Sequence, residues 1–454
     1  MLDKTVVLAG LNDEDRADRT LADVIELLVD PQVGVLQSLV ESRAEAGAPN
    51  FFHYRATAAN TAAFTRTANF AESAGVSAQR EVAASKAIGE AIERYCAAIY
   101  DVEDFPLVSY RAATFPCTAP SDFALYSLEQ YGRAEFPWVQ FDADTKVRWT
   151  AGVDMATGQV CYVPAARVYL PYMYYEDTED QPIDQPISTG LACHLDRNKA
   201  TRAAIGEVVE RDAFLIVWQA MIAPPQIRLE TLSAANQDLV ERFERAGSTV
   251  VMFDITLDHG IPTILSVLLG DVPTAPAMVV AAATSSEPEA AVRQSLEELA
   301  LTRMSCQYLK THAPPIISNL TGYADIDNQR AHLHFWTDHA NLPLASFLFA
   351  SEKRVAFDEI RNLATGDIAA DVRVMVERIG SVGERVVVVD VTTPELADLG
   401  FSVVRAVIPG FHPLHIGHSR RALGGKRLWQ VPKQLGFPGI TLHGGDNPAP
   451  HPYP

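Results

Sequence analysis

The chain has 454 residues, of which 48% are hydrophobic and 21% are charged, and its formal net charge is −20 at pH 7. This composition is typical of a soluble globular protein. The negative charge argues against non-specific binding to nucleic acid or to anionic membranes, because both require clustered Lys and Arg. The sequence contains neither a long apolar run that predicts a membrane span nor the features of a signal peptide. We therefore expect a cytoplasmic protein that binds neither nucleic acid nor a membrane.

Cysteine and histidine give only weak metal signals. The five cysteines form no CxxC pair, which predicts free thiols in a reducing compartment rather than structural zinc. Two groups of closely spaced histidines are His332, His334 and His339, and His412, His415 and His418. Such spacing can suit a metal, but a structural or phosphate-facing role is the favoured interpretation.

The predicted elements mix helices and strands. Apolar residues at helical spacing predict helix over residues 17–45, with a break at Asp30-Pro31. This segment could dock a partner, although plain packing onto the core is favoured. The strand-like runs are 147–149, 160–164, 248–253, 261–269, 278–283, 385–390 and 401–408, and a short helix is predicted at 394–399. The pattern indicates an α/β (α+β) fold.

The clearest feature is an eight-residue stretch that occurs twice. It reads AIGEAIER from Ala87 and AIGEVVER from Ala204. Both copies lie in Ala-rich segments that predict helices, so the two glutamates of each copy share a helix face. These charged residues are Glu90, Glu93 and Arg94 in the first copy, and Glu207, Glu210 and Arg211 in the second.

A third acid-bearing helix is predicted after residue 285. Residues 286–289 (Ser-Glu-Pro-Glu) have the types of a helix start, with the serine as N-cap and the last glutamate closing a capping box. Gln294 and Glu298 then share one face of this helix. Before the second copy, Ser188 begins a Ser-Thr-Gly turn that is expected to enter the helix, where free N–H groups can hold an anion.

Acidic faces on three helices require a reason, because carboxylates beside apolar surface are costly without a cation. Mg²⁺ prefers oxygen ligands and often shares them with substrate phosphates, which an arginine can grip. The chain lacks the GxxxxGK[ST] and GxGxxG phosphate loops, so such a site would be of the carboxylate type. A single ExxER is commonly just an exposed helix face. Two near-identical copies with a QxxxE helix favour a shared site.

These motifs resemble those of the YcaO family, which combines two ExxER motifs, a Ser-containing turn and a QxxxE. Further matches are residues 390–394 and 407–414, and the resemblance runs from about residue 60 to the end. It implies the YcaO fold, with mixed sheets and packed helices and an ATP site formed by three acid-bearing helices. We divide the chain into an N-terminal helical segment, 1–60, and a catalytic domain, 61–454, with a Pro-rich C-terminal tail.

The resemblance also implies roles for individual residues. The Mg²⁺ ligands would be Glu90, Glu93, Glu207, Glu210 and Glu298, and the ATP contacts would be Lys86, Arg94, Ser188, Arg211 and Gln294. The tail ends in the PxPxP typical of azoline-forming members, which implies catalytic roles for His451, Pro452 and Pro454. Proline stiffens this end, so its loss should lower the chemical step more than ATP binding. Lys86 stands where many members have serine.

The implied function is ATP- and Mg²⁺-dependent cyclodehydration. A side chain of Cys, Ser or Thr attacks a backbone amide, ATP phosphorylates the amide oxygen, and loss of phosphate leaves a thiazoline or oxazoline. Thioamide or amidine formation remains open, as does a non-catalytic assembly subunit of a peptide-modification complex. The implied partners are a ribosomal precursor peptide, a separate E1-like leader-binding protein, a flavin dehydrogenase and a second copy of the chain. The separate leader-binding protein is expected because 60 leading residues are too few for a fused one.

Overall fold

The computed structural model describes residues 20–45, 47–174, 179–316, 321–441 and 444–454. The helices are α2 Leu21–Leu28, α3 Arg80–Ala97, α4 Leu128–Tyr131, α5 Arg197–Gln219, α6 Ala234–Arg245, α7 Pro288–His312, α8 Gln329–Phe335, α9 Ile368–Ser381, α10 Pro394–Asp398 and α11 Lys426–Gln434. The strands are β1 Leu36–Ser42, β2 Phe52–Ala58, β3 Glu72–Ser77, β4 Leu107–Ser109, β5 Lys146–Asp154, β6 Val160–Pro164, β7 Leu191–His194, β8 Gln226–Ile227, β9 Ser248–Asp254, β10 Thr263–Gly270, β11 Met278–Thr284, β12 Arg354–Val355, β13 Val387–Asp390 and β14 Ser402–Val407.

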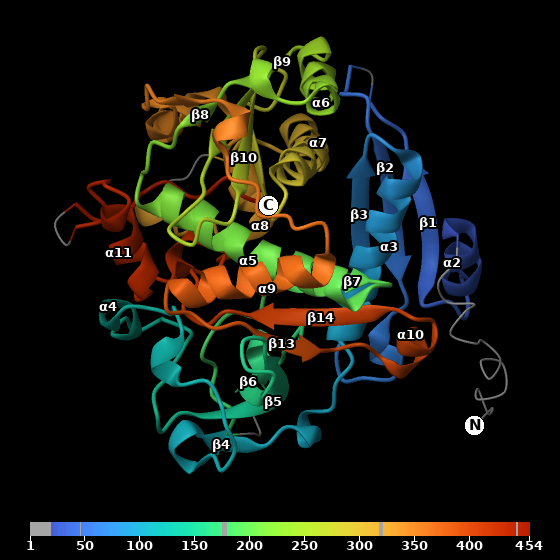
Figure 1. The fold of residues 1–454 in the computed structure, drawn as a ribbon, viewed down its shortest axis with the longest axis vertical. Helices are drawn as coiled ribbons and strands as arrows, with labels where there is room; N and C mark the ends of the chain where they lie inside the picture. The colour runs from blue at the N-terminus through green and yellow to red at the C-terminus, as the bar shows by residue number, and fades with distance from the viewer. Residues whose placement is uncertain (1–19, 46, 175–178, 317–320, 442–443) are drawn as a thin grey trace.

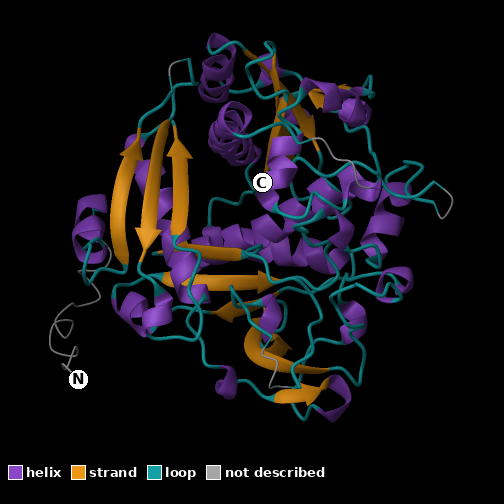
Figure 2. Ribbon diagram, turned by 180° about the vertical axis from the view of Figure 1, so that it is seen from behind, coloured by secondary structure: helices purple, strands orange, loops and turns teal. Residues whose placement is uncertain are grey.

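The first sheet is antiparallel, with strand order β1-β2-β3, and α3 packs against it (Figure 1). Figure 2 shows this sheet at one side of the molecule. At Gly75 in β3, a Cβ atom would lie 2.1 Å from the carbonyl oxygen of Ala83 in α3. The glycine therefore lets α3 lie directly on the sheet. This close packing sets the distance between the first ExxER motif and the sheet.

The helical prediction for residues 17–45 is only partly correct. Residues 21–28 are helical, but residues 36–42 form strand β1 and pair with β2. A short apolar run fits either period, and here pairing with a neighbouring strand decides the outcome. Residues 17–19 of the predicted segment lie outside the described residues. The domain boundary at residue 60 stays a prediction, although the sheet continues across it.

Within the described residues, two larger sheets have the strand orders β11-β10-β9-β8-β12 and β4-β5-β13-β14-β7, with β6 paired to β5. Helix α5 contacts both, since it packs on β14 and β7 and also on β11 (Figure 1). Helix α7 packs on β10 and β11 and reaches β3 of the first sheet. Helices α3, α5 and α7, which carry the predicted acids, thus meet where the three sheets come together.

The predicted fold class is confirmed, and the predicted strands overlap the observed β5, β6, β9, β10, β11, β13 and β14. The predicted helix at 394–399 is α10. Among the described residues, none of the helices has the length and apolar character needed to cross a membrane. In both views the C-terminus lies near the centre of the molecule, beside α5 (Figures 1 and 2).

Candidate active site

The first ExxER copy is held by backbone groups of neighbouring strands. Ile88, Ala91 and Ile92 bury one face of α3 in the core, which leaves both glutamates beside the sheet edges. Glu90 accepts a hydrogen bond from the Ala74 backbone N–H at 3.0 Å. Glu93 accepts one from the Cys193 backbone N–H at 2.9 Å.

The second copy is held mainly by side chains. Helix α5 is buried on most of its surface, including Val208 and Val209 between the two glutamates. Arg211 pairs with Glu210 and lies 3.5 Å from Glu207. Arg94 makes the corresponding pair with Glu90 in the first copy, at 3.2 Å.

The third helix joins the first through an ion pair. Lys86 Nζ lies 2.8 Å from Glu297 Oε2, and Glu297 is buried. The Ser77 hydroxyl donates to the other oxygen of Glu297 at 2.6 Å. Gln294 lies one turn before Glu298 on α7, as predicted. Lys86 thus reaches α7, where a second acid stands next to the predicted metal ligand Glu298.

The electrostatics show that the predicted acids converge. Burial raises the pKa of Glu93 well above its ordinary value, and the charges of Glu207 and Glu90 raise it further. Burial raises the pKa of Glu210 to about 7, and Glu207 and Glu298 act in the same direction. Burial also raises the pKa of Glu298, and Glu90 adds to this effect. Acids from α3, α5 and α7 therefore repel one another across a single site.

Mg²⁺ and ATP fit this arrangement. Buried acids that raise one another's pKa are relieved by a divalent cation, and carboxylate oxygens are suitable ligands. In the described part of the chain, however, no three His, Cys, Asp or Glu side chains are grouped as a ready metal site. Arg94 and Arg211 stand among the carboxylates and pair with them instead. The acids would have to exchange these ion pairs for a metal when the nucleotide binds.

Two local predictions are wrong. The turn at Ser188 leads into β7 rather than directly into α5, and the first N–H groups of α5 are capped by the Asp196 side chain. These groups are thus already satisfied by a carboxylate. Helix α7 begins at Pro288 with Glu287 as N-cap and shows no capping box, because the Ser286 hydroxyl donates to Asp371 instead.

The C-terminal tail is buried to different extents at the three residues predicted to be catalytic. His451 and Pro452 are buried, whereas Pro454 is only half-buried. The His451 ring stacks on His332 at 4.1 Å, and its nitrogens contact the His415 carbonyl and the Tyr453 N–H. The structure thus gives the His451 ring a role in holding the tail.

The structure adds a buried cation that sequence reasoning missed. Arg405 in β14 donates to the carbonyl oxygens of Arg167 and Ile187, and burial lowers its pKa to about 9. Its Nη1 has no hydrogen-bond partner among the described residues, and Arg405 lines a cavity of about 30 Å³. The signal that could have found it is an arginine inside the apolar run Val-Val-Arg-Ala-Val.

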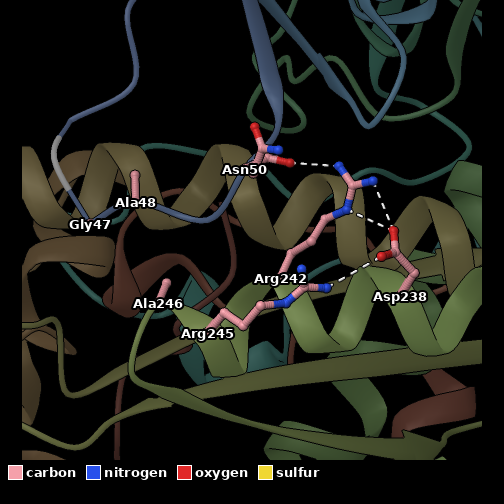
Figure 3. Close-up of a pocket in the computed structure, with 7 residues that line it drawn as sticks. All are labelled: Gly47, Ala48, Asn50, Asp238, Arg242, Arg245 and Ala246. Carbon is pink, nitrogen blue, oxygen red and sulfur yellow. Dashed lines mark hydrogen bonds and ion pairs between the residues drawn. The ribbon is translucent and has the colours of Figure 1, made fainter.

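A larger pocket, of about 200 Å³, lies away from the carboxylates (Figure 3). It is formed by residues 47–50 and the end of α6. Its two arginines, Arg242 and Arg245, pair with Asp238 at 2.8 and 3.3 Å, and Arg245 also pairs with Glu241 at 3.1 Å. Because these cations are already neutralised, we do not assign the pocket to the candidate site.

Comparisons with known proteins identify the family and the fold of the chain. Residues 74–412 match the model of the family described as YcaO cyclodehydratase, ATP- and Mg²⁺-binding. A solved heterocyclase in complex with substrate and cofactor has a TM-score of 0.79 and 21% identity, covering 95% of this chain and 56% of that chain. YcaO from Methanopyrus kandleri, bound with AMPPCP and Mg²⁺, has a TM-score of 0.60 and 21% identity, covering 85% and 88%. A chain of the E. coli microcin synthetase McbBCD complex has a TM-score of 0.59 and 14% identity, covering 91% and 96%.

The converging acids fit a nucleotide- and Mg²⁺-binding site of the carboxylate type. The chain belongs to the YcaO family, because the family model covers most of its length. The predictions of the family and of ATP and Mg²⁺ as its ligands are confirmed at the level of this family. The chain spans only about half the length of the heterocyclase chain that it resembles.

Proposed function

We propose that the chain is the ATP- and Mg²⁺-dependent cyclodehydratase subunit of a peptide-modification complex. Its substrate would be a ribosomal precursor peptide, in which Cys, Ser or Thr residues become thiazolines or oxazolines. The observation that carries the proposal is the convergence of Glu93, Glu210 and Glu298 from three helices at a site that the C-terminal tail enters.

The residues of the chain would divide the work. The five predicted glutamates would hold the metal, while Arg94 and Arg211 would leave them to face developing phosphate charge. When bound, ATP supplies the phosphoryl group that activates the amide oxygen, and Mg²⁺ neutralises the phosphates. The tail residues His451, Pro452 and Pro454 would take part in the chemical step at the reacting amide. Lys86, Ser188 and Gln294 would contact the nucleotide.

The proposal is tested by Glu90→Gln and Glu207→Gln, which remove one charge from each copy while preserving size. Calorimetry with ATP and Mg²⁺ should show binding to the wild-type chain and at least tenfold weaker binding to both variants. Co-expression with a candidate Cys/Ser/Thr-rich precursor peptide and a leader-binding protein should yield a peptide that has lost water. Unchanged binding and unchanged water loss in both variants would refute the assignment.

Two alternatives give different products. Attack by an external sulfide would replace amide oxygen with sulfur, and attack by an amine would form an amidine, so the mass of the product separates both from an azoline. A non-catalytic assembly subunit would bind its partners but not ATP. The carboxylates retained in all three motifs favour an enzyme over such a subunit.

The remaining expectations concern the surroundings of the chain. A separate E1-like leader-binding protein would deliver the peptide, a flavin dehydrogenase would oxidise azolines to azoles, and a homodimer would form within this cytoplasmic complex. Copurification with the products of neighbouring genes tests each of these partners, because a true subunit should migrate with the chain during gel filtration.

A further inference from the structure

The C-terminal tail is anchored along a buried path. Its backbone carbonyls accept hydrogen bonds from three rings: Trp218 Nε1 donates to Ala449 O at 3.2 Å, Trp336 Nε1 donates to Pro450 O at 2.9 Å, and His332 Nδ1 lies 2.9 Å from His451 O. Proline removes the N–H group and restricts the backbone, so these acceptor bonds fix the tail in one register. The register determines which side chain arrives at α5.

That side chain is Tyr453, which lies between the last two prolines and is only 2% exposed. Its hydroxyl donates to Glu210 Oε1 at 2.5 Å and accepts from Arg211 Nη1 at 2.6 Å and from the Ala282 N–H at 3.3 Å. The Arg211 guanidinium also lies over the Tyr453 ring, 4.5 Å from its centroid. One tail residue therefore contacts both a predicted metal ligand and the cation beside it.

Arg211 depends on these contacts for its orientation. Its Nε is buried and has no hydrogen-bond partner among the described residues. The guanidinium is held through its terminal nitrogens, by Glu207, Glu210 and the Tyr453 hydroxyl. Loss of the Tyr453 hydroxyl would leave Arg211 Nη1 with Glu210 as its partner and would remove one donor to Glu210 Oε1. Without the hydroxyl, Arg211 and Glu210 would rearrange around each other.

We propose that Tyr453 is a positioning residue that holds Glu210 and Arg211 in the arrangement that receives Mg²⁺ and ATP. The docked tail is then part of the nucleotide-binding structure and does not act in the chemical step alone. This inference rests on the proposed function. The sequence predicts that loss of the tail lowers the chemical step far more than ATP binding. The present inference differs, because it expects loss of Tyr453 to weaken ATP binding.

The test is Tyr453→Phe, which keeps the ring over Arg211 and removes only the hydroxyl. We expect ATP with Mg²⁺ to bind about tenfold more weakly by calorimetry, and the KM for ATP to rise more than kcat falls. Tyr172→Phe is the matched control, because Tyr172 is also buried and donates to a carboxylate, Asp180, at 2.5 Å. The control variant should bind ATP within twofold of the wild-type chain.

The outcomes separate this inference from the proposed function. A wild-type chain that binds no ATP overturns both. A wild-type chain that binds ATP, with Tyr453→Phe equal to it, overturns only the role of Tyr453. The wild-type chain also gives a measurement that needs no variant to fold: by linkage, Mg²⁺ with ATP should slow amide exchange at Tyr453 severalfold, and equal exchange rates would overturn the inference.

Discussion

The two copies of the ExxER motif have almost the same sequence but are stabilised differently. In the first copy, Glu90 and Glu93 each accept a hydrogen bond from a strand backbone, at Ala74 and Cys193. In the second copy, Glu210 is held by Arg211 and by the Tyr453 hydroxyl. Backbone groups in a paired strand have little freedom to move, whereas a side chain at the end of the chain moves with the tail.

One half of the site is therefore held by strand backbone groups, and the other half depends on docking of the tail. The first copy is complete when α3 has packed on its sheet and β7 has brought Cys193 beside Glu93. The second is complete only when the last residues of the chain are docked.

Replacement of the arginine in each copy should give the largest difference in stability between the two copies. Arg211→Met leaves Glu210 and Glu207 without their cation in a largely buried setting, so we expect a loss of about 3 kcal/mol of stability at pH 7. Arg94→Met removes a pair with Glu90, which is about a third exposed, and should cost about 1 kcal/mol. Urea unfolding of both variants measures the difference, and equal losses would show that the two copies are stabilised alike.

The pH dependence of stability gives the next largest effect. Burial raises the pKa of Glu210 from its ordinary value of 4.5 to about 7. The folded chain therefore binds this proton more tightly than the unfolded chain, and the contribution of Glu210 to stability is full below pH 4.5 and is lost as the pH rises through 7. The loss corresponds to roughly 3 kcal/mol at most.

Glu210→Gln isolates this contribution, because glutamine keeps the shape and does not ionise. The stability of the variant relative to the wild-type chain should rise as the pH increases from 5 to 8, measured by urea unfolding without nucleotide. A difference that stays constant over this range would mean that Glu210 is already ionised at pH 5. Exposed Glu129→Gln serves as the control and should show no such trend.

The sequence predicts the acids of the site better than the groups that hold them. Helical periodicity places Glu90 with Glu93 on one face, and the second copy follows the same local rule. The contacts that distinguish the copies come from Ala74, Cys193 and Tyr453, which are distant in sequence and carry no local signal. The strand at 36–42 was missed for the same reason, since its identity depends on the neighbouring β2.

Lys86 links the first copy to the third helix, and its removal should have a moderate effect. Lys86→Met leaves the buried Glu297 with the Ser77 hydroxyl and the Ala78 N–H as its hydrogen-bond donors among the described residues. We expect a loss of about 1–2 kcal/mol, less than for a fully buried pair because Lys86 is 29% exposed. The control is Arg80→Met on the same helix, whose exposed pair with Glu41 should contribute below about 0.5 kcal/mol.

The smallest effect should come from the glycine that the two copies share. A Cβ atom at Gly89 would meet nothing within 4 Å, whereas one at Gly206 would lie 3.1 Å from the Thr284 carbonyl oxygen in β11. Alanine favours the helix over glycine by about 1 kcal/mol, so Gly89→Ala should raise the midpoint of urea unfolding.

Gly206→Ala gains the same propensity but presses α5 away from β11, the strand whose Ala282 N–H contacts Tyr453. We therefore expect Gly206→Ala to be neutral or destabilising and to weaken ATP binding, while Gly89→Ala leaves it unchanged. Equal stabilisation by both substitutions would contradict this expectation. It would show that the contact between α5 and β11 accommodates a Cβ atom at Gly206 without cost.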